Sequence, residues 1–339
     1  MPIFALGIDT SNYKTSIAVT DSRGEIVFER SEFLKVPLGK KGLRQSDVFF
    51  KHSNLLPIFI EEVFKSINPS DISAIGVSAR PRNVSDSYMP CFLAGLNTAK
   101  QIGSALCVPV YEFSHQEGHA AAILEDTSLA KYNLDRCVFF HLSGGTTEFL
   151  ISNLSLNGYD MEIVGGTKDI SIGQLFDRIG VALGYTFPAG KDLDELALKH
   201  ILNTSASKSL TSLNLDIQCA DAYFNLSGIE TKIMRILDDV DTVTQEAIVS
   251  ALFNTISNLL YKSILYISKT YNINDFVISG GVASSQYLRT SLETHTNKDN
   301  INIVFGSSKL SGDNAVGISR LTYRINRRTY ETGNCFTNK

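Results

Sequence analysis

The chain has 339 residues and a formal net charge of -4, and 43% of its residues are hydrophobic and 19% are charged. These values describe a folded globular protein of about two domains, and they exclude a disordered chain and a strongly basic nucleic-acid-binding protein. No apolar run reaches the ~18 residues that a membrane-spanning helix requires. The amino-terminal stretch MPIFALGIDTS lacks the basic region and the cleavage site of a signal peptide. We therefore expect a cytoplasmic protein without a membrane segment.

The cysteines exclude two further classes of protein. They are odd in number and scattered, with no CxxC spacing, at Cys91, Cys107, Cys137, Cys219 and Cys335. That pattern is typical neither of a disulfide framework nor of a thiolate zinc site. Basic residues gather in two short clusters, Lys40, Lys41 and Arg44, then Arg324, Arg327 and Arg328. Both clusters fit solvated surface charge as well as contacts to an RNA backbone.

The chain opens on the pattern of a β-hairpin. Apolar runs at residues 3–8 and 16–20 flank a polar turn. About 130 residues later the pattern returns, with strands that start at Cys137 and at Glu148 around a turn over residues 143–147. This echo predicts a duplicated architecture in which each half begins with a strand, a polar turn and a second strand.

Helices and strands then alternate. Apolar spacing predicts helices over residues 46–67, 92–105, 170–183, 241–271 and 312–324, and strands over 74–78, 107–111, 275–279 and 301–305. Residues 114–123 also have a helical pattern, which puts His115 and His119 four residues apart on one face. Taken alone, that pair fits a metal site or two polar side chains that share a face. The alternation predicts an α/β protein of two lobes, residues 1–110 with the helix 312–330 and residues 111–311, with a cleft between them.

Three glycine turns each follow a strand, at residues 142–148 (LSGGTTE), 164–169 (VGGTKD) and 279–285 (SGGVASS). None matches a P-loop or a Rossmann fingerprint. Paired glycines let backbone N–H groups approach phosphate oxygens, so three such turns predict a nucleotide cradle. Asp9 lies at the end of an apolar strand, where a carboxylate must be paired or bound to a metal to offset the cost of burial.

Together these features resemble the actin-like ATPase (ASKHA) superfamily, in which two hairpins hold the phosphates and a late glycine turn holds the adenosine. Within it, nearly the whole chain resembles the TsaD family of tRNA threonylcarbamoyladenosine transferases. The family's HxExH motif stands at residues 115–119, SGGHTE at 143–148, AGEAFDK at 172–178 and PGGP at 188–191. Its FSGLKT resembles residues 226–231, its GGVAANxxLR residues 280–289 and its CTDNAAMI residues 311–318.

The resemblance implies one divalent metal, iron or zinc, held by His115, His119 and Asp313. We predict that Asp9 and Lys14 are catalytic groups. The resemblance also implies an adenine nucleotide (ATP, AMP or threonylcarbamoyl-AMP) bound by Ser143, Gly144, Gly145, Thr146, Gly173, Asp177, Gly190, Asp194, Gly281 and Ser285. Asp177 and Asp194 would accept hydrogen bonds from ribose hydroxyls, although Asp177 also fits an exposed helix carboxylate. The protease motif HExxH is absent, since Glu117 lies two residues from each histidine.

The implied reaction transfers a threonylcarbamoyl group from threonylcarbamoyl-AMP to N6 of an adenosine in the tRNA anticodon loop. TsaB-like and TsaE-like proteins would be partners, in a homodimer or heterodimer. The sequence departs from the family at Tyr13 and Lys14 (acids in ETSCDE), at Thr146 (the histidine of SGGHTE) and at residues 80–83, where Arg-Pro-Arg-Asn replaces GPGL. Only Asp169 remains of an acid pair, and Ser285 replaces an asparagine. These changes leave two alternatives: a paralogous carbamoyl-type transferase with a non-tRNA substrate, and a non-catalytic nucleotide-binding subunit.

Overall fold

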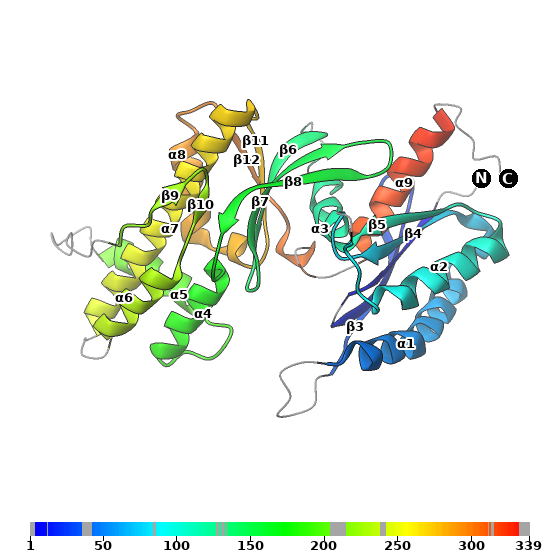
Figure 1. The fold of residues 1–339 in the computed structure, drawn as a ribbon, viewed down its shortest axis with the longest axis horizontal. Helices are drawn as coiled ribbons and strands as arrows, with labels where there is room; N and C mark the ends of the chain where they lie inside the picture. The colour runs from blue at the N-terminus through cyan, green and yellow to red at the C-terminus, as the bar shows by residue number, and fades with distance from the viewer. Residues whose placement is uncertain are drawn as a thin grey trace. The chain divides into compact units, whose positions relative to one another are not determined.

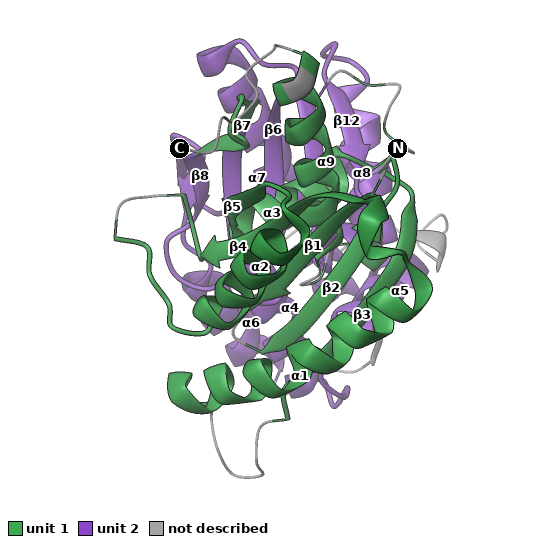
Figure 2. Cartoon of the chain, turned by 90° about the vertical axis from the view of Figure 1, so that its right-hand side faces the viewer, with its two compact units in different colours: residues 1–133, 153–161, 309–339 green, residues 134–152, 162–308 purple. Residues whose placement is uncertain are grey.

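The computed structural model describes residues 4–11, 13–35, 43–83, 86–126, 129, 132, 134–203, 215–237, 242–310, 312 and 315–331. The chain forms two compact units (Figure 2). The first contains residues 1–133, 153–161 and 309–339, and the second contains residues 134–152 and 162–308.

The first unit is built on a sheet with the strand order β3-β2-β1-β4-β5. Its strands are β1 (Phe4–Thr10), β2 (Lys14–Thr20), β3 (Ile26–Phe33), β4 (Ile72–Arg80) and β5 (Val110–Ser114). β1, β2 and β3 pair antiparallel, whereas β4 runs parallel to both β1 and β5. The carboxyl ends of β1, β4 and β5 therefore meet at one edge, where open α/β sheets bind their ligands.

Helices cover both faces of this sheet: α1 (Gln45–Ser66), α2 (Phe92–Leu106), α3 (His115–Leu124) and α9 (Val316–Glu331) (Figure 1). Because side chains alternate along a strand, Leu6 and Ile8 pack into the core with residues of α1 and α2. Gly7 faces α9 so closely that a Cβ there would lie 2.5 Å from the Ala315 carbonyl oxygen. Only glycine permits this approach of helix and strand.

The second unit is built on a sheet with the order β12-β11-β6-β7-β8-β10-β9. Its strands are β6 (Arg136–Leu142), β7 (Thr147–Leu154), β8 (Tyr159–Thr167), β9 (Cys219–Ala220), β10 (Tyr223–Phe224), β11 (Asp275–Ser279) and β12 (Asn302–Phe305). Its helices are α4 (Ile172–Ala182), α5 (Gly190–Asn203), α6 (Ser227–Leu237), α7 (Thr242–Tyr271) and α8 (Gln286–Thr296). Short 3₁₀ turns η1 (Pro69–Asp71), η4 (Val282–Ser284) and η5 (Ser308–Leu310) complete the described elements.

The predicted duplication is confirmed by the strand orders. Read from β8, the second sheet runs β8-β7-β6-β11-β12, which matches β3-β2-β1-β4-β5 of the first sheet position by position. β11 runs parallel to β6 and to β12, as β4 does to β1 and β5. β10 and β9 extend the second sheet at its β8 edge.

The starts of one predicted strand and one predicted helix were wrong. The strand expected at 107–111 begins at Val110, because Cys107 ends α2 in the left-handed conformation (φ 54°) and donates its N–H to the end of that helix. The final helix begins at Val316 rather than at 312. We expected the first lobe to end at residue 110, whereas the first compact unit continues to residue 133. The physical reason is that β5 pairs with β4 and α3 packs against α9, both inside that unit.

Among the described residues, one helix is long and apolar enough to cross a membrane by length and composition, residues Gln245–Tyr271 of α7. In its most apolar window, 56% of the residues are buried inside the protein. Leu252, Phe253 and Ile256 pack into the core of the second unit. This burial is the behaviour of a core helix.

Candidate active site

The predicted helix that carries the paired histidines is confirmed as α3, which begins directly after β5. Ser114 caps its amino terminus: the Ser114 hydroxyl accepts the Glu117 N–H at 3.1 Å, and Glu117 Oε2 accepts the Ser114 N–H at 2.7 Å. This is a capping box. We did not predict the role of Glu117, although the letters S-x-x-E at 114–117 carry that signal. This cap makes the helix begin at His115.

Glu117 is only 2% exposed, and its carboxylate stabilises the fold through hydrogen bonds. Its Oε1 accepts the backbone N–H of Tyr159 at 3.2 Å, and the Tyr159 hydroxyl donates to Glu125 just beyond the other end of α3. Burial raises the pKa of Glu117, while the hydrogen bonds from Ser114 lower it. Tyr159 is thus hydrogen-bonded to both ends of the histidine helix.

The two histidines face one another. Nε2 of His115 lies 3.0 Å from Nε2 of His119, and Nδ1 of His115 lies 2.9 Å from Oδ1 of Asp9. Because a carboxylate accepts a hydrogen bond, the His115 proton is assigned to Nδ1, which leaves the Nε2 lone pair available. Two nitrogens at ~2.1 Å from one metal, with angles of about 90–110°, are separated by ~3.0–3.4 Å. The pair therefore fits two ligands of a single ion.

Asp9 supports that fit by its burial. The side chain is 1% exposed, and its Oδ2 has no hydrogen-bond partner. Such an orphaned carboxylate oxygen is costly unless positive charge lies nearby. The predicted third ligand, Asp313, lies outside the described residues. Within the described part of the chain, no group of three His, Cys, Asp or Glu side chains is placed to hold a metal.

A histidine that we did not predict is hydrogen-bonded to the residue after β1 and to the second residue of β2, next to Lys14. His52 of α1 is fully buried. Its Nε2 donates to the Ser11 carbonyl at 2.8 Å, so Nδ1 accepts from the Thr15 hydroxyl at 2.7 Å. Burial lowers the pKa of His52, because desolvation disfavours the charged ring. The available signal was its place on the apolar face of α1, four residues from both Val48 and Leu56.

Lys14 lies at the start of β2, beside the strand that carries Asp9. Its Nζ lies 4.9 Å from the centre of the Phe33 ring, and Phe33 is itself exposed. The ammonium group is therefore held near the sheet edge by a cation–π contact. Its catalytic role stays a prediction.

In the second unit, a cavity of about 300 Å³ brings together seven of the predicted nucleotide-binding residues. They are Gly144, Gly173, Asp177, Gly190, Asp194, Gly281 and Ser285. Phe176, Pro188, Lys191, Val282 and Ser284 complete its lining. Ser143, Gly145 and Thr146 belong to the same turn as Gly144 but are not among the lining residues.

The amino terminus of α4 rests on that turn. A Cβ on Gly173 would lie 2.5 Å from the Ser143 carbonyl oxygen, so glycine is required for the approach. Ser171 caps the helix, accepting the Gln174 N–H at 3.0 Å and donating its hydroxyl to the Gly144 carbonyl at 2.7 Å. Helix amino termini favour anions. This wall of the cavity therefore suits a phosphate group.

The two carboxylates expected to meet a ribose are hydrogen-bonded within the protein. Asp194 Oδ1 accepts from the Ser285 hydroxyl and from the Tyr287 N–H, and its Oδ2 accepts from the Gln286 N–H. Asp177 Oδ1 accepts from the Ala189 N–H at 2.8 Å. Asp194 thus anchors the start of α8 in the cavity wall. A contact with ribose would have to use the lone pairs that remain.

Asp169, the acid retained from the family's pair, is held by several donors. Its Oδ1 accepts the N–H groups of Ile170 and Leu226, and its Oδ2 accepts that of Ser227. Burial raises the pKa of Asp169, but these hydrogen bonds outweigh it and lower the pKa to about 2. The carboxylate thereby fixes the start of α6.

We expect Asp169→Asn to lower the free energy of unfolding at pH 7 by about 1 kcal/mol, allowing for solvent screening of a partly exposed group. Because the folded pKa of about 2 lies below the ordinary value of 3.8, this stability is present above pH ~4 and is lost as the pH falls toward 2. Urea unfolding between pH 2 and pH 7 measures the difference. The control, Asp160→Asn, replaces an exposed aspartate, and a pH-independent difference at Asp169 would contradict the prediction.

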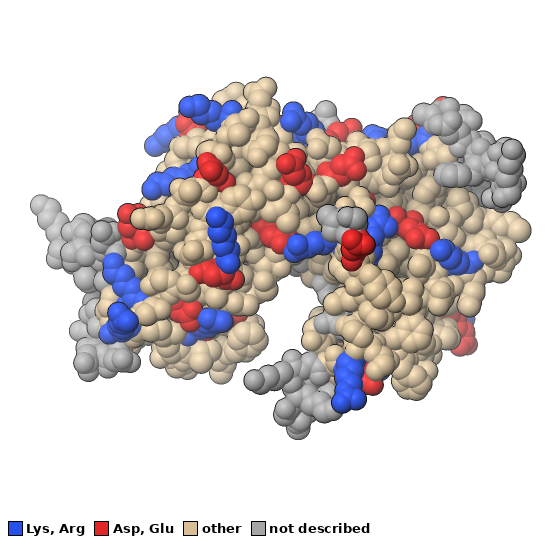
Figure 3. All heavy atoms as spheres, viewed as in Figure 1, with Lys and Arg blue, Asp and Glu red and all other residues tan. Residues whose placement is uncertain are grey.

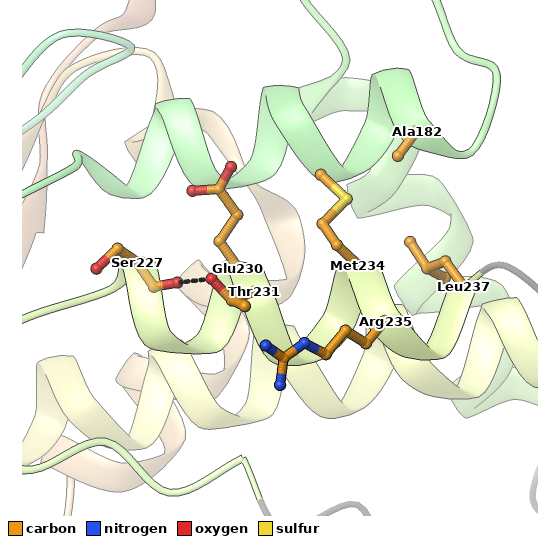
Figure 4. Close-up of a pocket in the computed structure, with 7 residues that line it drawn as sticks. All are labelled: Ala182, Ser227, Glu230, Thr231, Met234, Arg235 and Leu237. Carbon is orange, nitrogen blue, oxygen red and sulfur yellow. Dashed lines mark hydrogen bonds between the residues drawn. The ribbon is translucent and has the colours of Figure 1, made fainter.

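A second cavity, of about 490 Å³, lies between α4 and α6. Figure 4 shows Glu230 and Met234 pointing toward α4, whereas Arg235 points away from it. Ala182, Ser227, Thr231 and Leu237 complete its lining, and it includes none of the predicted site residues. Glu230 already accepts hydrogen bonds from Arg178. We regard this larger cavity as a groove between helices and not as the candidate site.

The basic clusters give weak support for an RNA surface. Arg324 donates to Glu125 at 2.6 Å and Arg327 to Glu331 at 2.7 Å, so two arginines of the later cluster are paired with acids. Lys40 and Lys41 of the earlier cluster lie outside the described residues. In Figure 3, basic and acidic side chains are interspersed over the face shown.

Comparison with known proteins decides the family. The family model "TsaD: tRNA N6-adenosine threonylcarbamoyltransferase" matches residues 46–320. The chain belongs to the TsaD family. Curated members of the family include the tRNA N6-adenosine threonylcarbamoyltransferases of Neorickettsia sennetsu, 26% identical over 317 residues (93% of this chain and 91% of the relative), and of Clostridium kluyveri, 27% identical over 328 residues (94% and 91%).

Solved structures confirm the fold. The HypF protein of T. kodakarensis matches with a TM-score of 0.60 at 12% identity, over 97% of this chain and 48% of HypF. Component A of the (R)-2-hydroxyglutaryl-CoA dehydratase of Acidaminococcus fermentans matches with a TM-score of 0.51 at 16% identity, over 96% and 99%. This TsaD-family chain therefore has the predicted fold of the actin-like ATPase superfamily.

Proposed function

We propose that this chain transfers a threonylcarbamoyl group from threonylcarbamoyl-AMP to N6 of an adenosine in the tRNA anticodon loop. The observation that carries the proposal is the histidine pair. Its two Nε2 atoms lie 3.0 Å apart with Asp9 bonded behind one ring, in a member of the TsaD family. The family's relatives are named for this transfer.

The residues of the first unit fit a resident metal ion. A divalent iron or zinc ion bound by His115, His119 and Asp313 would supply Lewis acidity to the phosphate or carbamoyl oxygen of the substrate. Asp9 holds His115 in the tautomer that exposes Nε2, and the capping box holds the helix that carries both rings. Lys14 adds a positive charge at the same sheet edge, where it would offset phosphate charge.

The glycine-turn cavity of the second unit would bind the adenylate part. Apart from the glycine itself, its chain neighbours and the backbone of its own helix, no described atom lies within 4 Å of the place where a Cβ on Gly144, Gly190 or Gly281 would stand. A ligand can therefore approach the backbone there. The start of α4 offers N–H groups to the phosphate, and Lys191 adds a cation to the lining. These features support adenine-nucleotide binding as the role of the cavity.

The transfer requires one bond to form and one to break. The N6 amine attacks the carbamoyl carbon, the bond from that carbon to the phosphate oxygen breaks, and AMP leaves with that bond's electron pair. The amine proton passes to solvent or to the released phosphate. Orientation of the two substrates supplies much of the rate enhancement in reactions of this kind.

We further propose the partners that the family resemblance implies. They are tRNA, TsaB-like and TsaE-like proteins, and a second subunit in a homodimer or heterodimer. We also propose a cytoplasmic location.

Purified protein, loaded with iron or zinc and supplied with threonylcarbamoyl-AMP, unmodified tRNA and the organism's own partner proteins, tests the proposal. We expect modified adenosine on digestion of the tRNA and analysis by mass spectrometry. A transcript with guanosine at the target position is the control. Absence of modified adenosine in the complete mixture, from protein shown to bind the metal, would overturn the proposed function.

A further inference from the structure

Arg80 lies at the edge of the sheet that carries the histidine site. It is the last residue of β4, and its register partner in β5 is Ser114, the residue directly before His115. On its other side β4 pairs with β1, which ends with Asp9 and Thr10. Neighbouring strands lie ~4.8 Å apart. The Arg80 backbone is therefore one strand away from the start of α3. Because Ile8 pairs with Val77, Arg80 lies one strand away from Asp9 and about two residues further along.

The loop that begins at Arg80 is bonded to the histidine helix. The Pro81 carbonyl accepts the N–H of Gln116 at 3.1 Å, which joins the loop to the first turn of α3. Since a residue before proline is restricted to extended conformations, the Arg80 backbone is held in place by Pro81.

The Arg80 guanidinium is oriented and makes no ion pair with the described residues, although its charge interacts with that of Glu117 in the first turn of α3. Its Nη2 donates to the Asn83 side-chain oxygen at 2.8 Å, a neutral acceptor three residues further along. Over the described ranges of the chain, no Asp or Glu lies within ion-pair distance of it, although the side chain is half-buried. An arginine has five N–H donors, of which this bond uses one. The remaining donors suit the planar, two-oxygen face of a carboxylate or phosphate.

We propose that Arg80 binds an oxyanion of the substrate beside the histidine pair and is a specificity-determining residue of this chain. The substrate itself rests on the proposed function, in which two groups have this chemistry: the carboxylate of the threonyl moiety and the phosphate of the adenylate. Lys14 begins β2, which lies on the other side of β1 from β4, so the two cations lie on the strands to either side of Asp9.

Steady-state kinetics with threonylcarbamoyl-AMP tests the residue. We expect Arg80→Gln to raise KM about 10- to 100-fold with a smaller change in kcat, as for loss of a charged hydrogen bond. Arg80→Lys should recover part of that loss, because it restores the charge without the two-pronged geometry. The control is Arg82→Gln, the same change of charge at an exposed position of the same loop, with a change in KM below twofold. Equal effects at both positions would overturn the proposal.

Labelling of the wild-type protein tests the site without turnover. Phenylglyoxal modifies arginines, and peptide mass spectrometry measures its rate at Arg80 and Arg82 separately. We expect an oxyanion probe to slow modification of Arg80 at least fivefold and that of Arg82 less than twofold. Protection by AMP and inorganic phosphate assigns the phosphate, whereas protection by threonylcarbamoyl-AMP and acetate, but not by AMP, assigns the carboxylate. No protection by any of the four overturns the proposal.

The two measurements separate this inference from the proposed function. If the complete mixture yields no modified adenosine but Arg80 is protected from phenylglyoxal, the proposed transfer to tRNA is overturned and the oxyanion site is supported. If transfer occurs while Arg80 is unprotected and Arg80→Gln leaves KM unchanged, only the oxyanion site is wrong.

Discussion

Replacement of His115 by alanine is expected to abolish stoichiometric metal binding and to lower the rate of transfer about a thousandfold. A bound metal supplies several kcal/mol to such reactions, and about 4 kcal/mol corresponds to three powers of ten in rate. With one imidazole removed, too few protein ligands remain to hold the ion. The fold should remain, because the His115 side chain is 20% exposed and alanine favours a helix. The same result is expected for His119→Ala.

Metal content by inductively coupled plasma mass spectrometry, together with single-turnover transfer rates, checks this prediction. The control is His200→Ala, a histidine of α5 in the second unit, which should retain both metal and activity. Circular dichroism confirms that each variant is folded. Full retention of metal by His115→Ala would show that the pair is a polar contact and not a ligand set.

Asp9→Asn is expected to have opposite effects on metal binding and on stability. The asparagine keeps the shape of the side chain but loses the charge that favours Nδ1–H on His115, so metal affinity should fall about 10- to 100-fold. In the metal-free protein at pH 8, the same change removes a buried charge whose Oδ2 has no partner. The melting temperature of the metal-free variant should therefore equal or exceed that of the wild type.

The matched control for these opposite effects on metal affinity and stability is Asp21→Asn in the same unit. Asp21 accepts the N–H groups of Arg23 and Glu25 and pairs with the Arg23 side chain, and these contacts outweigh burial and lower its pKa. Its loss should reduce stability and leave metal affinity unchanged. Chelator competition and differential scanning calorimetry measure the two quantities. An Asp9→Asn protein that loses stability but keeps its metal would place Asp9 in the fold and not in the metal site.

The sequence alone predicted what depends on local spacing. The i, i+4 spacing of His115 and His119 predicted that both rings lie on one helical face, and in α3 the two rings do lie side by side. The repeated pattern of strand, polar turn and strand predicted the duplicated sheets, because apolar alternation is a local property of each strand. The glycine turns at residues 142–148 and 279–285 likewise predicted residues that meet in one cavity. Their motifs are short and ordered, which also made the family recognisable.

Only the tertiary structure decided which distant residues touch. Asp9 and His115 are 106 positions apart and meet because β1 and β5 both pair with β4. The packing of α5 beside α8 puts Asp194 within hydrogen-bond distance of the Ser285 hydroxyl, and its expected contact with a ribose stays a prediction. His52 belongs to no motif, and Arg80 stands out in the sequence only because residues 80–83 depart from the family's GPGL. The contacts of both residues follow from helix packing and strand register. Such contacts depend on how whole elements pair and pack, which no spacing along the chain encodes.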